Sequence, residues 1–70
     1  MRYAVVIERT PSGYSAYLPD LPGCVAMGRS VAEVEALIAE AAALHIEGLL
    51  ADGQPVPPPQ SSVATVGVAA

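Results

Sequence analysis

Apolar and polar positions alternate with a period of two near the start of the chain, which predicts short strands. Turn residues separate these stretches, with Pro11 to Gly13 in the first connection and Pro19 to Gly23 in the second. The simplest arrangement is a three-stranded antiparallel meander over residues 1–28. The predicted strands are residues 2–9, 14–18 and 24–27.

The first predicted strand is largely apolar on both faces. One face carries Tyr3, Val5 and Ile7, and the other carries Val6 before Glu8 meets solvent. One helix covers only one face of a sheet, so we expect another subunit or a partner to cover the second face. Because aromatic residues are enriched at interfaces, we favour the face of Tyr3, Val5 and Ile7 as the oligomer face.

Helical signals begin after Gly28 and predict a helix over residues 30–53. Ser30 and Glu33 form an S-x-x-E capping box, in which the Ser30 hydroxyl accepts the Glu33 amide and the Glu33 carboxylate accepts the Ser30 amide. Gly53 is placed to cap the other end, because glycine readily adopts the left-handed backbone conformation that ends many helices.

The predicted helix carries more apolar surface than one packing stripe needs. His45 falls within the stripe, whereas Ile46 and Leu50 lie outside it. A second apolar edge of this kind usually touches something other than the helix's own sheet. The predicted stripe consists of Val34, Leu37, Ile38, Ala41, Leu44, Gly48 and Leu49.

A proline-rich run follows the helix and predicts a stiff, extended connector over residues 54–61. Residues 62–69 are small, apolar and weakly alternating, which favours a fourth strand that joins the sheet by a crossover through the helix. The chain is therefore interpreted as a single α+β domain over residues 1–70, with the order β-β-β-α-β.

Composition narrows the classes of partner. The 70 residues are 53% hydrophobic and 14% charged, which is much apolar surface for so small an interior and favours a homo-oligomer or a protein partner. A net charge of −4, with three arginines and no lysine, argues against nucleic-acid binding by this chain alone. The sequence has no apolar run long enough for a membrane span, and its one cysteine suits a reducing cytoplasm.

Candidate chemistry is sparse. Cys24 and His45 are a conceivable nucleophile and base, but a buried strand cysteine and a packed helix histidine are the favoured interpretation. The carboxylates are scattered, so they do not form the converging set that two-metal hydrolysis needs, and Cys24 with His45 falls short of a zinc site. Asp20 is expected to stabilise its own turn. We therefore predict no catalytic residue, no metal and no cofactor.

Four segments stand in order along the chain: Asp20-Leu21-Pro22-Gly23-Cys24, Gly28-Arg29-Ser30 with Glu33, Leu44-His45-Ile46-Glu47-Gly48-Leu49-Leu50, and Asp52-Gly53-Gln54-Pro55-Val56-Pro57. Together they resemble the HicB-like antitoxin family. The resemblance implies a partial ribonuclease-H-like fold of β-β-β-α-β order and a role as the toxin-binding domain of a type II toxin–antitoxin pair. It implies a HicA-like partner, a small ribonuclease that degrades messenger RNA. The DNA-binding segment that often follows this domain has no counterpart here, so DNA binding is not carried over.

The preferred hypothesis is a non-enzymatic bacterial antitoxin that acts in the cytoplasm and neutralises a toxin by covering it. Contact is expected through Ile46 and Leu50, or through the turn of Asp20, Leu21, Pro22 and Gly23. One alternative is a stand-alone homo-oligomeric domain with a regulatory or small-molecule role. A more distant alternative is a minimal hydrolase that uses Cys24 and His45.

Overall fold

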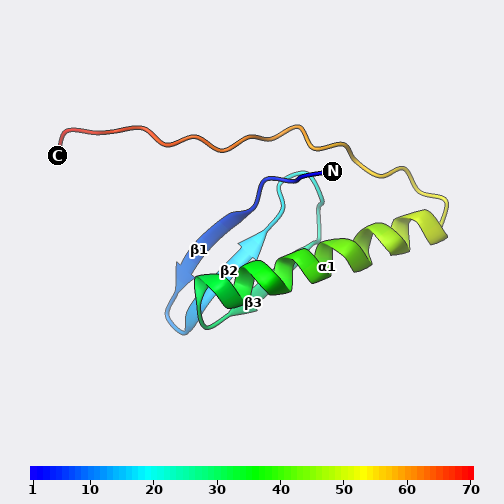
Figure 1. Cartoon of the computed structure of the whole chain (residues 1–70), viewed down its shortest axis with the longest axis horizontal. Coiled ribbons are helices and arrows are strands. Elements are labelled where there is room, and N and C mark those ends of the chain that lie inside the picture. The colour runs from blue at the N-terminus through cyan, green and yellow to red at the C-terminus, as the bar shows by residue number, and fades with distance from the viewer.

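The computed structural model describes all 70 residues, as three strands followed by one helix (Figure 1). The strands are β1 (Val6–Thr10), β2 (Gly13–Tyr17) and β3 (Val25–Gly28), and the helix is α1 (Val31–Ala51). The strands form one antiparallel sheet in the order β1-β2-β3. The predicted meander and the α+β class are thereby confirmed, although β1 begins at Val6 rather than at residue 2.

Two glycines allow the sheet its tight connections. Gly13 opens β2 with a φ of +154°, and a Cβ atom at this position would overlap the carbonyl oxygen of Gly28. Gly23 has a φ of +88° in the turn between β2 and β3, where the Cys24 amide donates to the Leu21 carbonyl at 3.1 Å. Residues other than glycine rarely adopt these backbone conformations. The glycines that the sequence places in both connections therefore match the structure.

Both ends of α1 are capped. The Glu33 amide donates to the Ser30 hydroxyl at 3.1 Å, as the capping box predicts. The Glu33 carboxylate accepts the amide of Arg29 at 3.0 Å, one residue earlier than predicted. At the other end, Gly53 has a φ of +67°. The Gly53 amide donates to the Leu50 carbonyl and the Gln54 amide to the Leu49 carbonyl, which is the Schellman arrangement.

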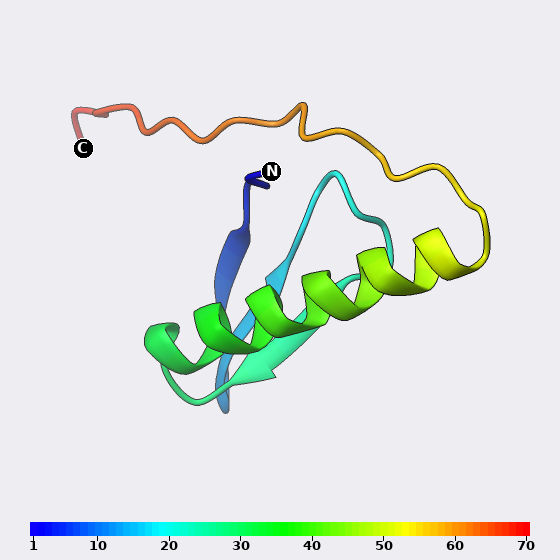
Figure 2. The same cartoon turned by 45° about the vertical axis from the view of Figure 1, so that its right-hand side comes forward.

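The core lies between α1 and the sheet, and α1 packs mainly on β3 and β2 (Figure 2). From α1, the buried side chains are Val34 and Ile38, and the row continues through the half-buried Ala42 and Ile46. The predicted stripe is therefore rotated. Its member Leu44 is 63% exposed, because it lies off the row that faces the sheet. The six buried residues are Ala16, Leu18, Leu21, Cys24, Val34 and Ile38.

The segment after α1 is extended and forms neither a strand nor a helix. Residues 54–70 cross above the start of β1 and continue past the sheet (Figures 1 and 2). The predicted fourth strand over residues 62–69 is not formed in this single chain, since no hydrogen bond between two backbone groups involves a residue beyond Gln54. The physical reason is local: the proline run is stiff, and contacts with Tyr3 and Asp20 direct it across the end of the sheet.

Candidate protein-binding surfaces

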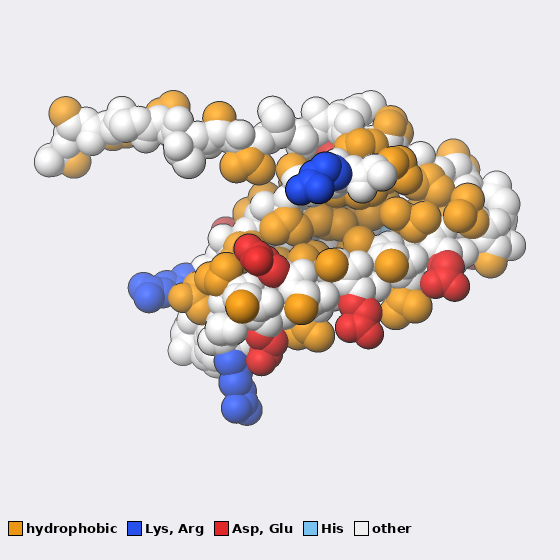
Figure 3. All heavy atoms as spheres, viewed as in Figure 1, with side chains coloured by type: hydrophobic (Ala, Val, Ile, Leu, Met, Phe, Trp, Pro, Cys, Tyr) orange, Lys and Arg blue, Asp and Glu red, His pale blue; other side chains and the backbone are white.

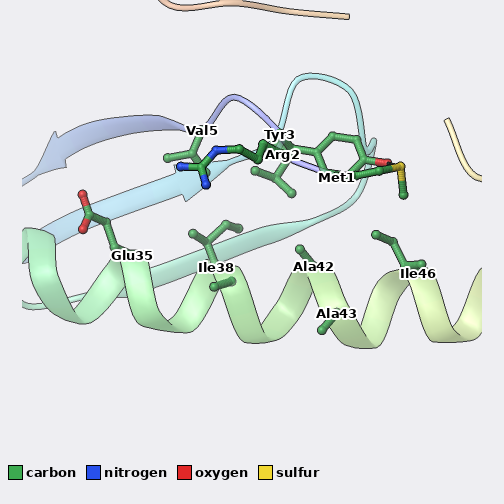
Figure 4. Close-up of a pocket in the computed structure, with 11 residues that line it drawn as sticks. Met1, Arg2, Tyr3, Val5, Glu35, Ile38, Ala42, Ala43 and Ile46 are labelled. Atoms are coloured by element: carbon green, nitrogen blue, oxygen red, sulfur yellow. Dashed lines mark hydrogen bonds between the residues drawn. The ribbon is translucent and has the colours of Figure 1, made fainter. Parts of the chain in front are cut away.

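A groove of about 620 Å³ lies between α1 and the residues that precede β1 (Figure 4). Hydrophobic atoms gather in this hollow, while acidic side chains project from the solvent side of the molecule (Figure 3). Nine of its 11 lining residues are hydrophobic, and a groove of this kind is suited to apolar contacts. The lining residues are Met1, Arg2, Tyr3, Val5, Leu18, Glu35, Ile38, Ala39, Ala42, Ala43 and Ile46.

The groove exists because α1 covers the sheet unevenly. The helix packs on β3 and β2. The part of the same sheet face that lies nearest β1 is therefore only partly covered. Tyr3, Val5 and Ile7 are half-buried and pack against the core from this side. Ile7 pairs with the buried Ala16, so the face of Tyr3, Val5 and Ile7 is the one over which α1 lies. That this face is also an oligomer face stays a prediction.

The uncovered face of the sheet is the opposite one. Val6, Tyr17 and Val25 are directly paired across the three strands and form one apolar row on it. Tyr17 is 41% exposed and Val25 66% exposed, and Met27 on the same face is 67% exposed. The expectation that one sheet face lacks cover in the single chain thus holds. The sequence alone did not identify which face, since both rows of β1 are apolar.

Asp20 anchors the segment that follows α1. Its carboxylate accepts the backbone amides of Ser61 at 2.8 Å and Gln60 at 2.9 Å, and the Ser61 hydroxyl at 3.0 Å. The amide of Ser61, and then that of Gln60, lower the pKa of Asp20 from its ordinary value by stabilising the charged form. A role in its own turn was expected, but the structure gives Asp20 partners 40 and 41 residues away.

A second contact secures the same segment. The Tyr3 hydroxyl donates to the Pro57 carbonyl at 2.6 Å. Tyr3 also lines the groove, so the start of the chain and the proline run meet at one end of this hollow. No sequence signal pointed to this contact, because a tyrosine hydroxyl and a backbone carbonyl 54 residues apart leave no local pattern.

The remaining residues predicted to bind a partner differ in exposure. Leu21 is fully buried in the core and offers no surface. Pro22 and Gly23 are exposed in the turn. Ile46 is half-buried and lines the groove, whereas Leu50 is 65% exposed. The predicted contact set is thus not one patch, and its accessible members lie at the turn and on the C-terminal half of α1.

The arrangement provides little for catalysis. Cys24 is buried, and burial raises the pKa of its thiol, which disfavours the nucleophilic thiolate. No side-chain hydrogen bond involves Cys24 or His45. No three His, Cys, Asp or Glu side chains lie together in a way that could hold a metal ion. No helix has the length and apolar character needed to cross a membrane.

Two curated proteins are similar to this chain in sequence. A 14.9 kDa protein from the rep-hol intergenic region of Haemophilus phage HP1 is 39% identical over 57 residues, which are 81% of this chain and 43% of the phage protein. A UPF0150 protein of Synechocystis is 43% identical over 56 residues, which are 79% of this chain and 71% of that protein. This chain therefore spans less than half the length of the phage protein.

Solved structures give the same result. A chain of the HicA3 and HicB3 toxin–antitoxin complex superposes with a TM-score of 0.74 at 38% identity, over 84% of this chain and 70% of that chain. The crystal structure of antitoxin HicB3 superposes with a TM-score of 0.71 at 37% identity, over 86% of this chain and 44% of that chain. Residues 3–68 match the family described as the HicB-like antitoxin of bacterial toxin–antitoxin systems, and the chain belongs to that family.

Proposed function

We propose that this chain is an antitoxin that binds and neutralises a HicA-like, messenger-RNA-degrading toxin in the cytoplasm. The observation that carries the proposal is the match of residues 3–68 to the HicB-like family, together with the superposition on a chain of a toxin–antitoxin complex. The chain acts by occupying the toxin's surface, and not as an enzyme. The burial of Cys24 supports that part.

The proposed toxin contact is the outer face of α1, formed by Glu40, Leu44, Glu47 and Leu50. These residues are three or four positions apart, so they follow one side of the helix. Leu44 is 63% exposed and Leu50 65% exposed, so both leucines are accessible to a partner. Glu40 and Glu47 are exposed beside them. An apolar and acidic face of this kind complements a basic nuclease, since opposite charge speeds encounter and disfavours wrong partners.

The exposed turn of Pro22 and Gly23 is the second proposed contact. A Cβ atom at Gly23 would lie 3.9 Å from the His45 ring, so this turn sits beside the C-terminal half of α1. A partner that covers the outer face of α1 could therefore reach the turn as well. The turn is rigid, because the Cys24 amide closes it onto the Leu21 carbonyl.

Co-expression with the neighbouring gene tests the antitoxin role. The small basic protein encoded beside this chain should arrest growth alone, should be harmless with this chain, and should co-purify with it at low salt. A neighbour that is harmless alone, or that does not co-purify, contradicts the proposal. The homo-oligomeric regulatory or small-molecule domain then becomes the better hypothesis.

A pair of matched substitutions tests the contact face. Leu50→Arg should raise the dissociation constant for the toxin about tenfold or more, because it places a positive charge in an apolar contact facing a basic partner. Ser12→Arg makes the same charge change at an exposed position in the turn between β1 and β2, outside the proposed contact. Equal affinity of both variants, measured by calorimetry, would move the contact elsewhere.

A further inference from the structure

The extended segment of residues 62–70 is the least explained part of the molecule. Its residues are all exposed and form no backbone hydrogen bond with the rest of the chain. Val63, Val66 and Val68 are 71%, 84% and 78% exposed. The segment has no charged side chain and is rich in β-branched residues, so its composition favours a strand, and it has no strand beside it to pair with.

A receiving site for such a strand is present in the same fold. β1 is at the edge of the sheet and pairs only with β2, so its outer backbone groups are unpaired. The groove adjoins this edge on the α1 side, where Tyr3 and Val5 face α1. On the helix, Ala39, Ala42 and Ala43 line the groove with small side chains that leave space for larger ones.

The side chains of the segment match this site. In a strand over residues 62–69, Ala64, Val66 and Val68 share one face, and Val63 and Thr65 share the other. Pairing with the edge of β1 would place the first row over the groove. The second row would then lie on the opposite face of the sheet.

The course of the segment favours a second copy over the chain's own β1. Two hydrogen bonds hold the residues just before the segment: the Tyr3 hydroxyl donates to the Pro57 carbonyl, and the Ser61 amide donates to the Asp20 carboxylate. The residues beyond Ser61 continue past the sheet (Figure 1). To reach its own β1, the chain would have to bend directly after Ser61, where residues 61–66 contain no glycine or proline. The radius of gyration is 13.7 Å, against about 11 Å for a compact chain of this length.

We infer that two copies of this chain exchange residues 62–69, each adding them as a fourth strand at the β1 edge of the other. The row of Ala64, Val66 and Val68 fills the partner's groove, and each groove is incomplete without the second copy. Such an exchange is two-fold symmetric and closes on itself. It also supplies the fourth strand that the single chain lacks.

The first test is the mass of the full-length chain alone, without any toxin. At micromolar concentration, sedimentation should give twice the 7.1 kDa chain mass. Val66→Asp should return it to the single-chain mass, because it places a charge in the groove. The matched control Thr65→Asp, on the opposite row, should keep the doubled mass. A wild-type chain of single mass, or a Val66→Asp variant of doubled mass, overturns the inference.

The second test locates the segment in the partner. Chains carrying Cys24→Ala and Thr65→Cys, with a spin label at residue 65, are mixed with unlabelled chains enriched in ¹⁵N. The label should broaden amide signals of β1 in the ¹⁵N chain. Broadening centred on Tyr17 and Val25 would identify a dimer through the uncovered sheet face instead, and no broadening would place the segment on its own chain. Either result overturns the exchange.

Discussion

The two sides of the sheet–helix layer are built from similar residues and reach different degrees of burial. Under α1, β2 contributes Ala16, and the loop between β2 and β3 contributes Leu21 and Cys24; all three are almost fully buried. On the β1 side, Tyr3 and Val5 are only half-buried beside the groove. The difference is one of cover, and not of composition. Because one helix is too narrow for three strands, the chain buries one half of this layer and leaves the other half only partly covered.

The largest expected effect comes from the covered side. Leu21→Ala should lower the free energy of unfolding by about 2–5 kcal/mol, because Leu21 is fully buried. A domain of this size has a stability of only about 3–5 kcal/mol, so the variant should be largely unfolded at room temperature. Urea denaturation followed by circular dichroism measures the change. The control Leu44→Ala, at an exposed site, should stay within about 0.5 kcal/mol of the wild type, and equal losses would contradict the burial difference.

Alanine substitutions at two glycines should change the stability of the chain in opposite directions. Gly13→Ala should destabilise the chain by more than about 1 kcal/mol, because its Cβ would overlap the Gly28 carbonyl and its φ is +154°. Gly48→Ala lies in α1 with nothing within 4 Å of the added Cβ. It should stabilise the chain by about 0.5–1 kcal/mol, since alanine is the better helix former. Thermal unfolding of both variants checks the signs, and a neutral Gly13→Ala would refute the close approach.

The smallest expected effect concerns Asp20, which holds residues 60–61 of the segment after α1. The pKa of Asp20 is lowered in the folded chain from its ordinary value of 3.8. The hydrogen bonds of its carboxylate to residues 60–61 are therefore fully present at a pH above 3.8, and they are lost as the pH falls through the lowered pKa. The amide signals of Gln60 and Ser61 in nuclear magnetic resonance spectra should then move to unstructured positions. Asp20→Ala should cause the same change at neutral pH, and Asp52→Ala should not. Unchanged signals in Asp20→Ala would show that the carboxylate is not the anchor.

Local signals allowed most of the fold to be predicted. The capping box at Ser30, the turn at Gly23 and the cap at Gly53 each depend on a few neighbouring residues, and the structure contains all three. The capping carboxylate of Glu33 was displaced by one residue, which is within the reach of a flexible side chain. Contacts of this range leave a readable pattern, so the order of the elements follows from them.

Long-range choices could not be predicted in the same way. Alternation in β1 indicates two faces, but the packing of α1 on β2 and β3 decides which one is covered. The contact between Asp20 and Ser61 joins positions 41 residues apart, so the anchor and the course of the last segment were missed. The apolar pattern of residues 62–69 indicated a strand, yet a strand forms only where a partner edge is available. The candidate binding surfaces depend on these choices, which is why the predicted contact residues were scattered.

The position of the core along the chain also has a consequence for kinetics. Every buried residue lies within positions 16–38, so core formation closes only short loops and should be fast and independent of concentration. Pairing of residues 62–69 with a second copy is bimolecular and obeys mass action. Refolding should therefore show a rapid first phase at constant rate, followed by a second phase whose rate rises in proportion to protein concentration.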